Sequence, residues 1–370
     1  MNKRQRLIIF MGIALILIII FGVIDRGSIK ASYFKGEFEI SIIEEKVNPF
    51  KSEINRKFKD GIIQFTEGEL SFNNYLGQNI WKVQLDVRNP QINTSIESIY
   101  IFDENINQLI KIDSNGKVVY RYTLEGKMKS FNVGQKYDIV LIYEELNNKS
   151  KVVNIVEKNG RKRSSIGIPE GHVLNMTLSV EHDLLALGVL DTSKEEIASH
   201  VLHYNLRGNL LNSTSLGNIV IYNMFFDREG KLIVISDKNI TALLKEKAKW
   251  SVDLHLVKLI KEMDSSSVAI YGLQNPNKGF MKKDDNILII ENHGKIIETE
   301  NISEQIVGID SFDQELVVYS KRTVYILDSN GNIVFKQKYN KDINEVYLFE
   351  KGHLIVVTKE NIYFNKLQKK

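Results

Sequence analysis

The chain has 370 residues, a formal net charge of +3, four prolines and no cysteine. Hydrophobic residues make up 43% of the chain and charged residues of both signs make up 26%, which excludes disordered, collagen-like and coiled-coil proteins. The lack of cysteine excludes disulfide frameworks and thiol-based metal, redox or nucleophile chemistry. One short basic cluster, Arg161 to Arg163, is too small to indicate a nucleic-acid-binding protein.

The N-terminal region contains an uncharged apolar run from Leu7 to Ile24. As a helix it would span roughly 27 Å, at about 1.5 Å per residue, which matches the hydrocarbon core of a bilayer. Lys3, Arg4 and Arg6 precede the run, and this positive charge predicts that residues 1–6 stay in the cytoplasm. No A-x-A-like cleavage site follows the run, which favours an uncleaved anchor over a signal peptide.

These features predict a single-pass protein of the cell membrane, with a transmembrane helix at residues 7–24 and the rest of the chain outside the cytoplasm. Residues 25–60 mix charges, isolated aromatic residues and one proline, without a sustained period of 2 or 3.6. The sequence therefore predicts a linker or stalk at 25–60 and a separate domain at 61–370.

One pattern occurs seven times within the domain: an apolar strand-like run is followed by a tight polar turn and then by a second apolar run. The turns are centred on Gly77, Gly116, Gly160, Gly208, Glu246, Gly294 and Gly331. Their mean spacing of about 42 residues is typical of a β-propeller. Because each repeat is too small to bury its own core, the repeats must stack on one another.

The runs within each repeat predict an all-β protein with four-stranded blades. Second strands such as Ser98 to Phe102 are nearly unbroken apolar runs, as expected for strands buried on both faces. Third strands such as Leu109 to Asp113 lead into Asn-Gly or acidic turns suited to a hairpin. Residues 252–263 could also form an amphipathic helix, but the repeat spacing favours strand and loop there. Four outer strands carry an aromatic residue four positions past the turn: Trp81, Tyr120, Trp250 and Phe335.

The two ends of the domain are expected to complete one another. Six full four-strand units fit between about residues 86 and 339, and three further strands follow at the C-terminus. Joining these three strands to an outer strand at Ile80 to Leu85 makes a composite seventh blade, closed by N- and C-terminal strands, which removes open sheet edges. Further strands at Ile62 to Phe65 and Leu70 to Phe72 could replace one or two of the C-terminal strands in this blade. The strand composition of the closing blade is therefore open, and the alternative number of blades is eight.

The hairpins Ile110 to Tyr120 and Ile326 to Phe335 resemble those of degenerate quinoprotein-like and WD40-like propellers. The layout of one N-terminal span followed directly by a propeller resembles an uncharacterised family of membrane-anchored bacterial proteins that carry a domain of unknown function. This resemblance implies the fold and brings no catalytic residues with it. The chain lacks both the cysteines of many quinone-dependent dehydrogenases and a recurring Trp-Asp strand end.

Motifs for chemistry are missing from the sequence. It contains neither a G-x-S-x-G nucleophile elbow nor a phosphate-binding G-x-x-x-x-G-K loop. His200 and His203 would point to opposite faces of one strand and could not easily chelate one ion. We therefore expect no catalytic residue, no cofactor and no metal site.

Long loops carry the clearest functional signal. Residues 144–151, 191–199 and 275–285 connect second and third strands of three blades and should lie on one rim of the propeller, where partners are commonly bound. The sequence predicts binding residues in the third loop, where apolar residues lie among cationic neighbours: Lys278, Phe280, Met281, Lys282 and Lys283.

The resulting functional prediction is a membrane-anchored, extracytoplasmic propeller that acts as a non-catalytic binding or scaffolding platform in the cell envelope. Its expected partners are the membrane, through the N-terminal helix, and a protein or envelope polymer on the loop rim, without nucleic acid. The alternative is a quinoprotein-like propeller that binds a cofactor or acts as an enzyme through polar groups in its central channel.

Overall fold

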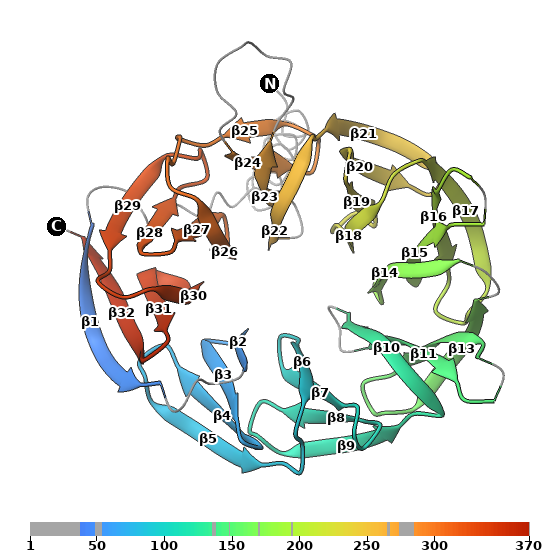
Figure 1. Cartoon of the computed structure of the whole chain (residues 1–370), viewed down its shortest axis with the longest axis horizontal. Coiled ribbons are helices and arrows are strands. Elements are labelled where there is room, and N and C mark those ends of the chain that lie inside the picture. The colour runs from blue at the N-terminus through green and yellow to red at the C-terminus, as the bar shows by residue number, and fades with distance from the viewer. Residues whose placement is uncertain are drawn as a thin grey trace, which may run out of the picture. The chain divides into compact units, whose positions relative to one another are not determined.

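The computed structural model describes residues 38–48, 54–134, 138–147, 149–168, 171–193, 195–264, 267–273 and 285–369. These residues form eight four-stranded antiparallel sheets that are arranged around a ring as the blades of a β-propeller (Figure 1). In each blade the first strand lies nearest the centre of the ring and the fourth lies at its circumference. The described part of the chain has no α-helix and one 3-10 turn, η2 (Glu350–Gly352).

The first four blades follow one another along the chain. Blade 1 contains β2 (Ile54–Phe58), β3 (Gly61–Thr66), β4 (Glu69–Asn74) and β5 (Asn79–Gln84). Blade 2 contains β6 (Pro90–Thr94), β7 (Ser98–Asp103), β8 (Gln108–Asp113) and β9 (Val118–Thr123). Blade 3 contains β10 (Gly126–Val133), β11 (Ile139–Glu145), β12 (Lys151–Val156) and β13 (Lys162–Ile168). Blade 4 contains β14 (His172–Ser179), β15 (Leu184–Asp191), β16 (Ala198–Tyr204) and β17 (Leu210–Gly217).

The remaining four blades complete the ring. Blade 5 contains β18 (Ile221–Phe226), β19 (Leu232–Ser236), β20 (Asn239–Leu244) and β21 (Lys247–Asp253). Blade 6 contains β22 (Leu256–Asp264), β23 (Ser267–Leu273), β24 (Asn286–Glu291) and β25 (Ile296–Glu298). Blade 7 contains β26 (Ile306–Phe312), β27 (Glu315–Ser320), β28 (Thr323–Leu327) and β29 (Ile333–Lys338). Blade 8 contains β30 (Ile343–Leu348), β31 (His353–Thr358), β32 (Asn361–Lys369) and β1 (Phe38–Val47).

The expected number of seven blades is wrong, because the structure has eight. Seven hairpin turns between third and fourth strands do occur, one in each of blades 1 to 7. Blade 8 lacks this turn because its fourth strand comes from the other end of the described chain. The number of turns is therefore one less than the number of blades.

Ring closure also differs from the expectation. The outer strand of blade 8 is β1, which pairs antiparallel with β32 from Phe38 opposite Lys369 to Val47 opposite Asn361 (Figure 1). The backbone N–H of Asn48 continues this pairing by donating to the Glu360 carbonyl at 2.6 Å. Of the segment at residues 80–85, which was expected to be the closing strand, residues 80–84 instead lie in β5 and complete blade 1. The propeller thus begins within the region that was expected to be a linker.

The prediction of a single-pass membrane protein is not borne out by the described residues. No helix among the described residues is long and apolar enough to cross a membrane. The predicted span at residues 7–24 lies outside the described residues.

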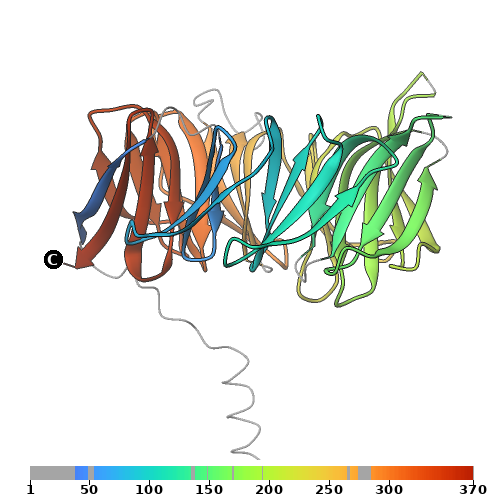
Figure 2. The same ribbon diagram turned by 90° about the horizontal axis from the view of Figure 1, so that it is seen from below.

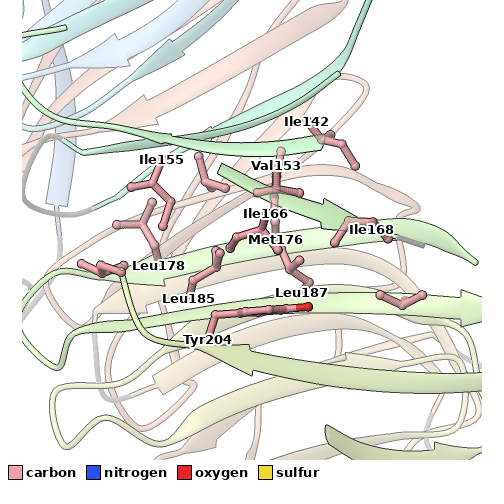
Figure 3. Close-up of a cluster of buried hydrophobic side chains, with 13 residues drawn as sticks. Ile142, Val153, Ile155, Ile166, Ile168, Met176, Leu178, Leu185, Leu187 and Tyr204 are labelled. Carbon is pink, nitrogen blue, oxygen red and sulfur yellow. The ribbon is translucent and has the colours of Figure 1, made fainter. Parts of the chain in front are cut away.

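Adjacent blades are held together by apolar side chains from their facing sheets. Between blades 3 and 4, for example, Val153 and Ile155 of β12 lie in one buried cluster with Leu185 and Leu187 of β15 (Figure 3). All four side chains are completely buried. Residues 252–263, which could also have formed a helix, lie in strands β21 and β22 and in their connection, as the repeat spacing favoured. Figure 2 shows the blades from the side, with the strands of each sheet twisted as they cross the thickness of the ring.

The hairpin turns are built by the residues that the sequence singled out. Oδ1 of Asp113 accepts hydrogen bonds from the backbone N–H groups of Asn115 and Lys117, both at 2.9 Å. Gly116 then takes a φ of +81°, which is readily adopted only by glycine. Asp328 forms the same two backbone bonds in the corresponding turn of blade 7.

Candidate functional site

The predicted rim residues Lys278, Phe280, Met281, Lys282 and Lys283 lie outside the described residues. Strands β23 and β24, which flank them, end at Leu273 and begin at Asn286. Because the four strands of each blade are antiparallel, the second and fourth strands end at the same face of the ring. We call this the connection face, and the opposite face, which carries the turns between third and fourth strands, the turn face.

The connection face has an open groove at blades 7 and 8, with a volume of about 720 Å³. The groove takes its lining from both blades and from the chain just before β26. We call it the connection-face groove, and its lining residues are Glu304, Gln305, Val307, Ser320, Lys321, Arg322, Thr323, Lys338, Ile343 and Asn344.

Backbone hydrogen bonds fix the shape of the groove. The N–H of Ile343 donates to the Lys321 carbonyl at 2.8 Å, and the N–H of Tyr339 donates to the Arg322 carbonyl at 2.7 Å. These two bonds attach the β27–β28 hairpin of blade 7 to the segment that leads into blade 8. The walls of the groove are therefore held by the same contacts that join the two blades.

The groove combines exposed charges with an exposed apolar side chain. Asp342 pairs with Arg322 at 2.7 Å and with Lys321 at 3.0 Å, and the hydrogen bond from Arg322 is the main reason that the pKa of Asp342 is lowered. Lys321 and Arg322 still have more than half of their side-chain surface exposed. Val307 is 46% exposed beside them. Charged and apolar groups side by side on a polar rim are common in protein–protein interfaces.

Glu304 is the acidic residue in the lining of the groove. Its carboxylate accepts a hydrogen bond from the Tyr325 hydroxyl at 2.7 Å and another from the Ser320 hydroxyl. Partial burial raises the pKa of Glu304, but these hydrogen bonds outweigh burial and the net pKa is lowered. The carboxylate is therefore ionised at neutral pH and fixed in orientation.

A second pocket, of about 340 Å³, lies at the inner edge of the ring. Its lining comes mainly from the innermost strands of blades 1, 2, 6, 7 and 8. We call it the inner-edge pocket, and its lining residues are Arg56, Lys57, Thr94, Lys261, Ile309, Asp310, Tyr319, Glu345, Val346 and Tyr347.

Asp310 is the centre of the charged groups in the inner-edge pocket. Its Oδ2 accepts from Nζ of Lys57 in blade 1 at 2.8 Å and from the backbone N–H of Leu348 in blade 8 at 3.0 Å. Its Oδ1 lies 2.7 Å from Nζ of Lys261 in blade 6. Asp310 itself belongs to β26 of blade 7, so one carboxylate connects four consecutive blades across the place where the ring closes.

Opposing effects act on the pKa values of this cluster. Burial alone would raise the pKa of Asp310, but Lys57 and Lys261 outweigh burial and lower it. The pKa of Lys57 is lowered mainly by burial, and Asp310 opposes that shift. Since the two groups are close and oppositely charged, we regard both as ionised at neutral pH.

Glu345 and Tyr347 form a second polar group in the pocket. The Tyr347 hydroxyl lies 2.9 Å from Oε2 of Glu345 and 3.2 Å from the Asn55 carbonyl, which links blade 8 to blade 1. Burial raises the pKa of Glu345, and the hydrogen bond from Tyr347 and the charge of Arg56 partly offset this. Burial also raises the pKa of Tyr347 far above its usual range, so its hydroxyl stays protonated.

Sequence reasoning missed both sites. Lys57 and Asp310 are 253 positions apart in the chain, and neither belongs to a local motif. The only signal was an acidic residue in the middle of the β26 sequence IVGIDSF, where an ordinary core strand would be apolar. Among the described residues, no group of three His, Asp or Glu side chains is arranged to hold a metal ion.

Solved structures similar to this chain include a WD40 domain and BamB. The C-terminal WD40 domain of Sif2 matches with a TM-score of 0.61 and 10% identity, over 89% of this chain and 98% of that domain. BamB from Moraxella catarrhalis matches with a TM-score of 0.54 and 11% identity, over 88% of this chain and 99% of BamB. At such low identity these similarities show the fold alone.

Sequence comparisons give a family match and no curated relative. A search of curated proteins finds no match. A family model described as "Family of unknown function (DUF5711)" matches residues 38–367, which is nearly the whole propeller and includes the closing strand β1.

Proposed function

We propose that this chain, which belongs to the DUF5711 family, is a non-catalytic binding platform. In this proposal the propeller holds a partner protein on its connection face. The observation that carries the proposal is the connection-face groove, with exposed Val307 beside the cations of Lys321 and Arg322. This combination suits a partner segment that places a small apolar side chain in the groove and carboxylates at its edge.

The scaffold supports this role because it is rigid where the groove lies. Every residue of strands β27 and β28 is buried, and the groove walls are tied together by backbone hydrogen bonds between blades. A preformed surface loses little conformational entropy on binding, so its contacts contribute more fully to affinity.

The rim loop that the sequence predicted is also part of this proposal. Its flanking strands β23 and β24 belong to blade 6, next to blade 7, which provides much of the groove. We therefore include Lys278, Phe280, Met281, Lys282 and Lys283 in the proposed binding surface. They would add cationic and apolar groups to those of Lys321 and Val307.

The experiment first identifies the partner and then measures its affinity. A photo-crosslinking amino acid at Val307, in the full chain within its native cells, captures what contacts the groove. Binding of the purified partner is then measured for a Lys321→Glu/Arg322→Glu variant. We expect at least a tenfold loss of affinity, since like charges at an interface are unfavourable. The matched control is Lys117→Glu/Lys158→Glu, two exposed lysines at turns of the turn face, which should bind unchanged.

The rim loop is tested in the same assay by alanine replacement of Phe280, Met281, Lys282 and Lys283. Unchanged affinity would remove this loop from the binding surface. Equal affinity of the Lys321→Glu/Arg322→Glu variant and the unaltered chain would refute the connection-face groove as the binding site.

A further inference from the structure

We propose that the inner-edge pocket binds a small multivalent oxyanion, such as phosphate or a tricarboxylate, between Arg56 and Lys261. This site is separate from the connection-face groove and does not depend on the function proposed for it. Its ligand is recognised by charge and by N–H donors.

The charge balance of the pocket is the first argument. Three cations, those of Arg56, Lys57 and Lys261, line it together with two carboxylates, those of Asp310 and Glu345. Asp310 shares its single negative charge between both lysines. Glu345 is held by Tyr347, and its partial burial disfavours the ionised form. The pocket therefore carries a surplus of positive charge, which an anion would neutralise.

The available donors are the second argument. Lys57 is committed, because its ammonium donates to Asp310 at 2.8 Å and to the Ser311 carbonyl at 2.7 Å. It also lies 5.1 Å from the ring centre of Phe349. Lys261 is less enclosed, with 32% of its side chain exposed, and its ion pair within the described part of the chain is with Asp310, at 2.7 Å. An ammonium has three N–H donors, so Lys261 keeps donors that can face the pocket.

Arg56 supplies the second set of donors. It is exposed, and its Nη1 donates to the Asn55 carbonyl at 2.8 Å. A guanidinium has five N–H donors in a planar fork that matches carboxylate and phosphate oxygens. Arg56 belongs to β2 and Lys261 to β22, so the two cations approach the pocket from different blades.

The pocket is also positioned in advance of binding. Asp310 fixes the Lys261 ammonium, and the Thr94 hydroxyl donates to the Lys57 carbonyl at 3.0 Å. A volume of about 340 Å³ has room for roughly ten water molecules at about 30 Å³ each, which is enough for a phosphate or a citrate ion. Cations that are already held in place around a space of this size lose little conformational entropy when an anion binds.

The experiment uses the full chain in an anion-poor buffer, titrated with inorganic phosphate and, separately, with citrate. Binding is followed by calorimetry and by the thermal unfolding temperature, with sodium chloride at equal ionic strength as the reference. At a ligand concentration ten times Kd we expect the unfolding temperature to rise by about 2 °C. Arg56→Gln and Lys261→Gln should each weaken binding at least tenfold, whereas Lys117→Gln on the turn face should have no effect.

Each outcome decides the matter. Binding of both anions with loss in the two pocket variants supports general oxyanion recognition, and binding of one narrows the ligand to phosphate-like or polycarboxylate chemistry. Equal binding by Arg56→Gln and the unaltered chain, or no binding beyond the sodium chloride reference, would overturn the proposal. Arg56→Gln keeps the test valid even if Lys261→Gln does not fold, because Arg56 makes no bond to Asp310. Partner binding at the connection-face groove should be the same in all these variants.

Discussion

The indole ring of Trp81 in blade 1 covers Gly116 in the hairpin turn of blade 2, and its Nε1–H donates to the Ser114 carbonyl at 2.9 Å. The same relationship recurs between Trp250 of blade 5 and Gly294 of blade 6, with the indole donating to the Asn292 carbonyl at 2.7 Å. In these two pairs of neighbouring blades, the aromatic residue past one turn packs on the glycine of the next turn around the ring.

This relationship predicts a measurable cost for a methyl group at Gly116. A Cβ there would come within 2.8 Å of two carbons of the Trp81 ring, and the φ of +81° also disfavours alanine. Gly116→Ala should therefore lower the free energy of unfolding by more than the roughly 1 kcal/mol of the backbone effect alone. Urea denaturation measures the loss.

The matched control for Gly116 is Gly217. It has a φ of +74° and no atom within 4 Å of an added Cβ, so Gly217→Ala tests backbone strain without a clash. Equal losses of stability in the two variants would show that the Trp81 contact does not restrict the turn.

Asp310 should be the most sensitive charged position in the described propeller. Asp310→Asn leaves the ammonium groups of Lys57 and Lys261 without their carboxylate, and breaking a buried ion pair in this way costs about 3 to 5 kcal/mol. Asp342 also pairs with two cations but is exposed, so Asp342→Asn should be nearly neutral. Urea denaturation of both variants checks this, and similar losses in the two would contradict a buried hub at Asp310.

Glu345 should make stability depend on pH. Burial raises the pKa of Glu345 above its ordinary value of 4.5. A carboxyl group with a higher pKa in the folded state than in the unfolded state stabilises the protein while it is protonated. This stabilisation is fully present at a pH below the pKa of the unfolded state, and it is lost as the pH rises through the pKa of the folded state. Glu345→Gln cannot ionise, so its stability relative to the unaltered chain should increase from about pH 4.5 toward neutral pH and then level off.

Tyr347→Phe provides the complementary test. The Tyr347 hydroxyl donates to the Glu345 carboxylate and lowers its pKa, so its removal should move this pH-dependent step to higher pH. Thermal unfolding of the three chains across the pH range measures both effects. A difference between Glu345→Gln and the unaltered chain that is constant with pH would show that Glu345 does not titrate differently on folding.

Strand β1 should be required to close blade 8. Removal of residues 1–47 deletes β1, leaves β32 as an unpaired edge and removes Phe38 from a buried cluster. We expect a lower unfolding temperature and concentration-dependent association, because open edges pair with other chains. Light scattering after gel filtration detects the association.

The control for this deletion is a chain that lacks residues 1–33 only and keeps β1 intact. It should keep the association state and the unfolding temperature of the full chain. If both deletions behaved alike, β1 would not be needed for closure.

Much of each blade could be predicted from sequence because its determinants are local. The unbroken apolar run Ser98 to Phe102 lies in β7, and the turns at Asp113 and Asp328 form as their side chains require. Hairpin pairing joins neighbouring segments, so period, strand composition and turn residues are enough to place second, third and most fourth strands.

The closing strand could not be recognised in the same way. The sequence of β1, FEISIIEEKV, has five apolar residues, four charged residues and one serine. An outer strand is exposed to solvent on part of its surface, and this mixed composition resembles that of a linker. The blade number was wrong for this reason: the segment at 80–85 was assigned to closure when its own blade already began at Ile54.

By itself, the sequence determined that this protein is built from repeated four-stranded sheets, since each hairpin is encoded by residues next to one another. Only the tertiary structure decided that there are eight blades, that β1 pairs with β32, and that Lys57, Lys261 and Asp310 meet in one pocket. The pairing of β1 with β32 and the contact of Lys57 with Asp310 join residues hundreds of positions apart. These partners are set by closure of the ring, which leaves no local pattern in the chain.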